Sequence, residues 1–153
     1  MPSIENKIPP PVIAGVFAAA MWGLSFIGPA IGLNEITRSA IIFLLIIFGI
    51  ILGVLGLVSF RQAATTIDPL HPEETSALVT NGIYRISRNP MYVGLALFLG
   101  AWAVYLHSAW SIVGIPGFVL FMNRFQIGPE EKALSEIFGP EYKNYQSKVR
   151  RWF

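Results

Sequence analysis

The chain of 153 residues contains no cysteine and little charge. Without cysteine, disulfide bonds, thiolate metal sites and cysteine nucleophiles are excluded. Charged residues make up 13% of the sequence, whereas a soluble domain carries about 25%. So few charges do not cover a water-facing surface, and 54% of the residues are hydrophobic. The composition predicts an integral membrane protein, and the length suits a single domain over residues 1–153.

Several functional motifs are also missing. The sequence has no glycine-rich phosphate loop, no dinucleotide fingerprint and no basic-aromatic pattern typical of nucleic-acid binding. It has two histidines, His71 and His107. His71 is followed by Pro72-Glu73-Glu74, but no second histidine stands at metal-ligand spacing, so we expect no metal site. We also expect no serine hydrolase chemistry, because neither of the two histidines has a place beside a pocket serine.

Four apolar segments are candidates for membrane spans, because a bilayer core takes roughly 17–25 residues of helix. We expect an all-α bundle with spans at about 11–33, 39–60, 90–106 and 109–127, a cytoplasmic loop before the third, and amphipathic helices in a tail over 128–153. The first apolar run has no cleavage site after a short core, which favours a retained helix over a signal peptide.

Glycine and proline positions give further detail of the spans. Pro29 is expected to kink the first span, and the Gly-Ile-Pro-Gly run at 114–117 to bend the fourth. Gly49, Gly53 and Gly56 lie on nearly one face of the second span, which favours close packing of a neighbouring helix.

The distribution of lysine and arginine predicts the orientation. With the N-terminus in the cytoplasm, ten of the eleven basic residues fall on the cytoplasmic side and only Arg38 on the other. Both termini are therefore expected in the cytoplasm. In the tail, an apolar stripe recurs at helical spacing over Phe138, Tyr142, Tyr145, Val149 and Trp152, interrupted by a break at Gly139-Pro140. Such a stripe lies on lipid headgroups or closes over a pocket, and the two are compatible.

Polar residues stand where the third span begins and where the fourth ends. Arg88 and Asn89 precede Pro90, a residue suited to a first helical turn, and Tyr92 follows one turn in. The unpaired N–H groups of a helix start favour an anion, to which Arg88 can add two hydrogen bonds. Arginine and tyrosine also serve as membrane anchors. Glu130 and Glu131 follow Pro129, where acidic residues stabilise a first turn or bind a ligand.

The ordered motifs resemble those of the isoprenylcysteine carboxyl methyltransferase family and the related membrane phospholipid methyltransferases, over about residues 65–153. The family pattern Arg-His-Pro-x-Tyr-x-Gly is similar to residues 88–94, and its Glu-Glu pair to residues 130–131. A leucine, a Phe-Gly pair and a Tyr-x-x-Tyr before a basic end then follow, here Leu134, Phe138-Gly139, Tyr142, Tyr145 and Val149-Arg150-Arg151. Two positions differ from the family: Asn89 replaces a histidine, and Gln126 stands where an arginine is frequent, with Arg124 two residues earlier.

The resemblance implies S-adenosylmethionine as cofactor and a lipid-like or prenylated small-molecule or protein acceptor, most simply methylated on a carboxyl oxygen. It assigns cofactor binding to Arg88, Asn89, Pro90, Tyr92, Gly94, Glu130 and Glu131. Arg124 and Glu131 are its candidate catalytic residues. A phospholipid amine methyltransferase and a non-catalytic membrane subunit remain alternatives, and a sterol reductase ranks below them because the chain is short.

Overall fold

The structure is a computed structural model that describes residues 8–63 and 76–153. The predicted loop residues at 65–74, with His71, lie outside the described residues. The helices, in chain order, are α1 (Pro10–Ser25), α2 (Glu35–Gln62), η2 (Gly82–Arg85), α3 (Pro90–Leu106), η3 (Ala109–Val113), α4 (Gly114–Met122), η4 (Asn123–Ile127), α5 (Gly128–Phe138) and α6 (Pro140–Lys148). These two described ranges contain no β-strand, only one bridge between Ala30 and Ser108. The all-α expectation is confirmed.

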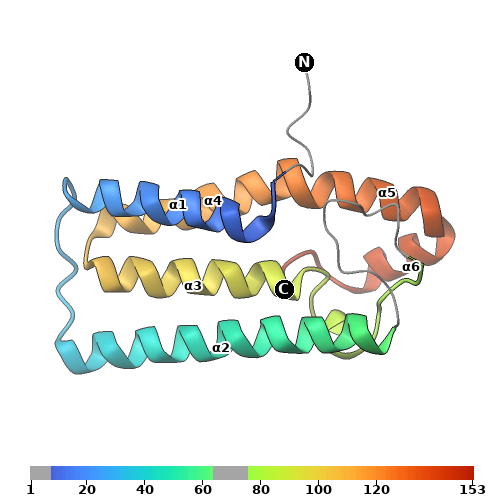
Figure 1. Cartoon of the computed structure of the whole chain (residues 1–153), viewed down its shortest axis with the longest axis horizontal. Helices are drawn as coiled ribbons and strands as arrows, with labels where there is room; N and C mark the ends of the chain where they lie inside the picture. Colours follow the sequence, from blue (N-terminus) through green and yellow to red (C-terminus); the bar gives the residue numbers. More distant parts are fainter. Residues whose placement is uncertain (1–7, 64–75) are drawn as a thin grey trace, which may run out of the picture.

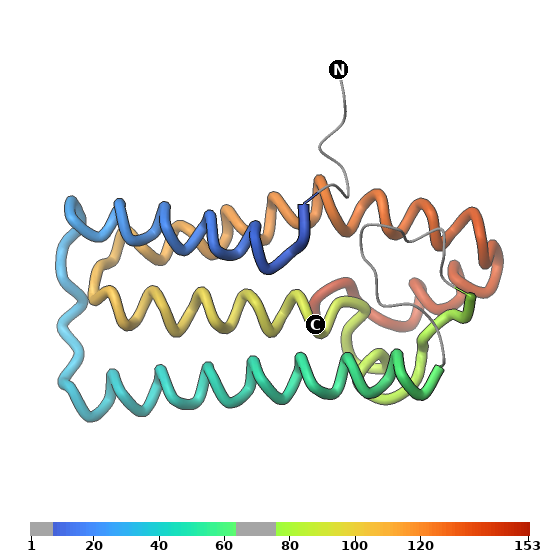
Figure 2. Tube along the Cα trace, in the orientation of Figure 1, coloured from blue at the N-terminus to red at the C-terminus, as the bar shows by residue number. Residues whose placement is uncertain are grey.

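The long helices run along one axis, with α3 in the middle (Figure 1). Helix α2 packs on one side of α3, while α1 and α4 pack together on the other side. Helices α5 and α6 and the short η2 gather at one end of the bundle, and the chain then returns so that the C-terminus lies beside the start of α3 (Figure 2). This arrangement brings the beginning of α3 next to the tail.

Glycines allow α2 and α3 to approach closely, as expected for the second span. A Cβ added to Gly94 would lie 2.9 Å from the carbonyl oxygen of Gly49, and one added to Gly56 would lie 2.6 Å from Cγ of Met91. Side chains at these positions would force the helices apart, since contacts this short are repulsive. Gly53, on the same face, meets no atom within 4 Å and lines a cavity instead.

Two details of the expected spans are wrong. Helix α1 ends at Ser25, so Pro29 lies beyond the helix rather than kinking it. Proline disfavours helical geometry at the preceding residue, here Gly28, and no helix resumes before α2 begins at Glu35. The fourth segment is not one α-helix, because η3, α4 and the π-turn η4 follow one another and continue into α5.

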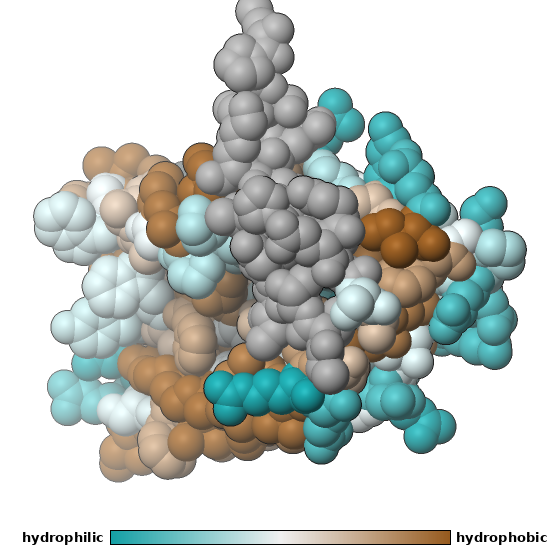
Figure 3. Space-filling view, turned by 45° about the vertical axis from the view of Figure 1, so that its right-hand side comes forward, coloured by the Kyte–Doolittle hydropathy of each residue, from teal (hydrophilic) through white to brown (hydrophobic). Residues whose placement is uncertain are grey.

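Apolar side chains face outward along the bundle. Helix α2 is the one described helix that is long and apolar enough to cross a membrane, and α1 and α3 are shorter apolar helices. Exposed hydrophobic side chains cover much of the surface of α2, among them Phe43, Phe48, Ile51 and Val54. Hydrophilic residues gather toward the end with α5 and α6, on the right in Figure 3. A soluble monomer rarely exposes so continuous an apolar surface.

The tail folds back against the protein. Gly139 has φ of 50°, a value glycine adopts readily, and it joins α5 to α6 at the predicted Gly139-Pro140 break. Tyr142, Tyr145 and Val149 form a buried cluster with Leu78, Leu134 and Phe138. The apolar stripe therefore packs on the chain itself. Of the two arrangements that the sequence allows, this is the one in which the tail closes over the protein rather than lying on lipid headgroups alone.

Candidate active site

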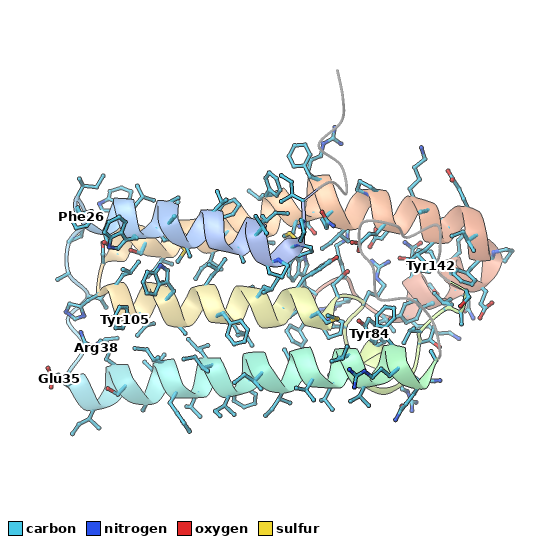
Figure 4. All side chains as sticks on the ribbon, in the orientation of Figure 1. Phe26, Glu35, Arg38, Tyr84, Tyr105 and Tyr142 are labelled. Carbon is cyan, nitrogen blue, oxygen red and sulfur yellow. The ribbon has the colours of Figure 1, made fainter. Side chains whose placement is uncertain are left out.

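A cavity of about 470 Å³ lies at the α5–α6 end of the bundle. Its walls come from α2, η2, α3, α5, α6 and the start of α1. Polar side chains line one part: Arg88, Asn89, Tyr92, Glu130, Glu131 and Tyr142. The remainder is apolar and runs along the α2–α3 contact, past Gly49, Gly53, Phe60, Met91, Leu95 and Phe98. Figure 4 shows Tyr84 and Tyr142 at this end, opposite Glu35 and Arg38.

Arg88 stands directly before α3 with its side chain largely buried. Its Nη1 lies 3.2 Å from Oε1 of Glu131, and its side chain is also hydrogen-bonded to the hydroxyl of Tyr142. The buried Nε of Arg88 has no hydrogen-bond partner among the described residues. An unsatisfied buried donor costs about 1–3 kcal/mol, so a ligand that accepts from it is favoured. Arg88, which lines the cavity, therefore has an unused hydrogen-bond donor.

The C-terminal segment holds the start of α3 in place. The backbone N–H of Arg88 donates to the carbonyl of Arg150 at 3.0 Å. Nδ2 of Asn89 donates to the carbonyl of Arg151 at 2.9 Å, and its backbone N–H donates to Oγ of Ser87 at 3.1 Å. Asn89 lines the cavity, but its side-chain amide is engaged with the chain.

Glu131 is paired with two arginines. Arg151 donates to it from Nη2 at 2.5 Å and from Nε at 3.0 Å, and Arg88 is the second partner. Hydrogen bonding to Glu131 raises the pKa of the Arg151 guanidinium further above its usual value. This two-point contact fixes the tail to α5, since planar guanidinium and carboxylate groups match in geometry.

Glu130 has a different environment. The hydroxyl of Tyr92 donates to its Oε1 at 2.5 Å, and the side chain of Gln126 is also hydrogen-bonded to it. Burial raises the pKa of the Glu130 carboxyl to about 7, and Glu131 adds to the rise, although the two hydrogen bonds lower it. A carboxyl with a pKa near 7 exchanges protons readily at neutral pH.

The π-turn η4 decides which side chain of this segment contacts Glu130. Pro129 has no N–H, and the N–H of Gly128 bonds five residues back to Asn123. In this turn Gln126 is buried and contacts Glu130, whereas Arg124 is exposed and does not line the cavity. The position of Arg124 therefore gives no support to its expected catalytic role.

The remaining predicted residues serve packing. Pro90 is buried in the first turn of α3, and the Gly94 backbone contacts α2 while also bordering the cavity. No local pattern in the sequence indicated that Gln126 contacts Glu130 or that Arg151 binds Glu131. The basic end was visible as a motif, but nothing local showed that it returns to α5. The described residues contain no group of three side chains suited to a metal ion.

The cavity brings together Arg88, Tyr92, Glu130 and Glu131 from sequence positions about forty residues apart. A model of the family described as phospholipid methyltransferase matches residues 37–141. The chain belongs to this family. The match includes α2, α3 and the glutamate pair, and it confirms the resemblance drawn from the motifs.

Individual relatives of this family member are methyltransferases or carry no described activity. The chain is 32% identical to a probable protein-S-isoprenylcysteine O-methyltransferase of Oryza sativa subsp. indica, over 69% of the chain and 55% of that protein. It is 33% identical to a methanethiol S-methyltransferase of Pseudomonas deceptionensis, over 58% of the chain and 32% of that protein. An uncharacterized protein of Haemophilus influenzae is 45% identical over 40% of the chain and 98% of its own length. The chain spans about half the length of the plant relative.

Proposed function

We propose that this phospholipid methyltransferase family member transfers a methyl group from S-adenosylmethionine to a lipid-like acceptor at the cytoplasmic surface of a membrane. The observation that carries the proposal is that one cavity has both a polar and an apolar part. When bound, S-adenosylmethionine supplies a methyl group already activated on a sulfonium. The protein's task is then to align the acceptor and exclude water, for which neither a metal nor a protein nucleophile is needed.

Arg88 is the residue best suited to hold the cofactor's carboxylate. Its buried Nε lacks a partner among the described residues, and a carboxylate would satisfy it. Glu131, at 3.2 Å from Arg88, orients that arginine. The apolar part of the cavity, with Phe60, Leu95 and Phe98, suits the hydrocarbon of the acceptor.

The helices support a membrane setting for this reaction. Helix α2 has 28 residues, which corresponds to about 42 Å, enough to cross a bilayer core of about 30 Å. We propose that α1, α3 and the η3–α4–η4 segment cross beside it, giving a multi-pass protein of four spans with both termini cytoplasmic. This topology puts Arg38 outside and the polar part of the cavity inside.

The acceptor has several candidates. Carboxyl O-methylation of a prenylated acceptor follows from the names of the isoprenylcysteine methyltransferase relatives. A thiol acceptor follows from the name of the Pseudomonas deceptionensis relative, and a phospholipid amine from the name of the family. A non-catalytic subunit is less well supported, since it gives no reason for Arg88, Tyr92 and Glu130 to line one cavity.

Labelled methyl transfer in membranes tests the proposal. Membranes from cells expressing the native chain are incubated with S-adenosylmethionine carrying a radioactive methyl group, and label is counted in lipid and protein fractions. We expect more label in membranes with the native chain than in vector membranes. Arg88→Gln should lose most of this label. Arg85→Gln should keep it, because Arg85 is exposed and outside the cavity. Label equal to that of vector membranes contradicts the proposal.

A further inference from the structure

The charges of the cavity are distributed unevenly. Arg88 is the one cationic side chain among the described residues that line it, and it is paired with Glu131. Arg151 lies on the far side of Glu131 and is paired with the same carboxylate. Glu130 contacts a phenol and an amide, with no cation among the groups that act on its charge. The cavity therefore has a cationic region at Arg88 and an acidic region at Glu130.

This acidic region disfavours an anionic acceptor. A carboxylate placed beside Glu130 would face a second negative charge in a site sheltered from water, where like charges raise each other's pKa by several units. Gln126, buried to 1% exposure, supplies an uncharged amide at the position one turn before Glu130. It offers a hydrogen bond to Glu130 but no positive charge to balance an acceptor carboxylate.

We infer that the acceptor group is a thiol on an apolar carrier and that Glu130 removes its proton, an inference that rests on the proposed methyl transfer. In this step the acceptor sulfur forms a bond to the methyl carbon while its proton passes to the Glu130 carboxylate. The electron pair of the broken sulfonium–methyl bond stays on the donor sulfur. The products are a methyl thioether, neutral Glu130 and the neutral thioether form of the donor, so atoms and charge balance.

The groups around Glu130 suit a proton acceptor. Tyr92 of α3 donates to it, Gln126 of η4 hydrogen-bonds to it, and the charge of Glu131 of α5 raises its pKa. Glu130 in turn raises the pKa of the Tyr84 hydroxyl of η2. Its pKa of about 7 is closer to that of a thiol, about 8.5, than to that of an alkylammonium, about 10.4. A neutral thiol also avoids placing a second positive charge beside a sulfonium, as an ammonium would.

Three probe acceptors of equal chain length distinguish the chemistries. Purified protein in detergent is given labelled S-adenosylmethionine with decanethiol, decanoate or decylamine. We expect the thioether as the main product, at least about tenfold above the ester and the N-methylamine. A faster ester or N-methyl product overturns the inference, and so does the absence of all three products from protein that binds S-adenosylhomocysteine. Native protein that does not bind S-adenosylhomocysteine instead contradicts the proposed function itself.

Variants test the role of Glu130. Glu130→Gln should lower thiol methylation about 100-fold, a usual effect of losing a general base, while S-adenosylhomocysteine affinity stays within about threefold. Glu130→Asp should recover part of the rate, and the matched control Glu136→Gln, on the exposed face of α5, should leave it unchanged. In the native protein the rate of thiol methylation should rise with pH through about 7. Glu130→Gln should not show this rise. An unchanged rate and pH profile in Glu130→Gln would exclude proton removal by this residue.

Gln126→Arg tests the charge argument in a second way. An arginine at this position pairs with Glu130 and supplies the missing cation, so it should move labelling from decanethiol toward decanoate. Infrared difference spectra of native protein against Glu130→Gln provide a readout without turnover, with the protonated carboxyl band expected to disappear as pH rises through 7. A Gln126→Arg protein that binds S-adenosylhomocysteine and keeps the native preference contradicts the inference.

Discussion

Arg151 binds Glu131 through two parallel hydrogen bonds, Nη2 to Oε2 at 2.5 Å and Nε to Oε1 at 3.0 Å. The contact joins the C-terminal segment to α5 across twenty residues of sequence. Since Glu131 also faces Arg88, the tail stabilises the arginine proposed to hold the cofactor. Arg150, its neighbour, is exposed and contributes only its backbone carbonyl to the start of α3.

Replacing Arg151 should therefore weaken cofactor binding, and replacing Arg150 should not. In Arg151→Gln, Glu131 has Arg88 as its one remaining arginine partner and competes with the cofactor carboxylate for it. We therefore expect the affinity for S-adenosylhomocysteine to fall about tenfold, or about 1.4 kcal/mol. Arg151→Lys should recover part of it, since one charged contact remains. Calorimetric titration of both variants against Arg150→Gln measures the difference. Equal affinities in the Arg151 and Arg150 variants would show that the tail has no such role.

The buried carboxyl of Glu130 should make the fold less stable as pH rises. Its pKa in the folded protein, about 7, exceeds the ordinary value of 4.5. The protonated form is then favoured by folding, so its stabilising effect is complete below pH 4.5 and is lost as pH rises through 7. The shift corresponds to roughly 3 kcal/mol at most.

Unfolding in detergent at pH 5 and pH 8 measures this dependence. The native protein should lose stability between the two values, and Glu130→Gln should lose less and exceed the native protein at pH 8. Glu136→Gln, an exposed glutamate on the same helix, should keep the native difference. If Glu130→Gln and native protein lose stability in parallel, Glu130 titrates outside this range.

Close packing of α2 on α3 predicts a strong effect of adding one methyl group at Gly94. Its new Cβ would lie 2.9 Å from the carbonyl oxygen of Gly49, which is backbone and cannot move aside. We expect Gly94→Ala to destabilise the protein by about 1–3 kcal/mol, as overpacking does. Gly100→Ala on the same helix is the control, since its Cβ meets Cδ1 of Leu45 at an ordinary 3.6 Å. Melting temperatures that match within error would argue against close contact of the two helices.

The absence of cysteine makes the membrane orientation easy to test. Ile36→Cys, at the exposed start of α2, and Lys148→Cys, at the exposed end of α6, each introduce a single thiol. A membrane-impermeant maleimide added to intact cells should label Cys at position 36, and position 148 only after permeabilisation. Labelling of both positions from the same side contradicts the proposed topology.

Local signals in the sequence were sufficient for several elements. Helix α3 has the expected bounds because Pro90 sets its start and His107, with φ of 55°, ends it. The glycine face of α2 and the Gly139-Pro140 break also follow from residue chemistry. The polar cavity was expected from two motifs far apart, and the structure brings their side chains together.

The features that were missed depend on contacts over long distances or on unusual backbone geometry. Gln126 rather than Arg124 contacts Glu130 because of the π-turn η4. The inserted residue of such a turn rotates the side chains that follow it relative to an α-helix. Asn89 was expected to bind a cofactor, but its amide holds the carbonyl of Arg151, 62 residues later. No pattern near either residue encodes that pairing.

The most direct test of the central claim is calorimetric titration of the purified native protein with S-adenosylhomocysteine, compared with Arg88→Gln and the exposed control Arg85→Gln. We predict saturable binding to the native protein and to Arg85→Gln, and an affinity at least about tenfold lower in Arg88→Gln with its thermal unfolding still cooperative. No binding by the native protein, or equal affinity in all three, would contradict the account.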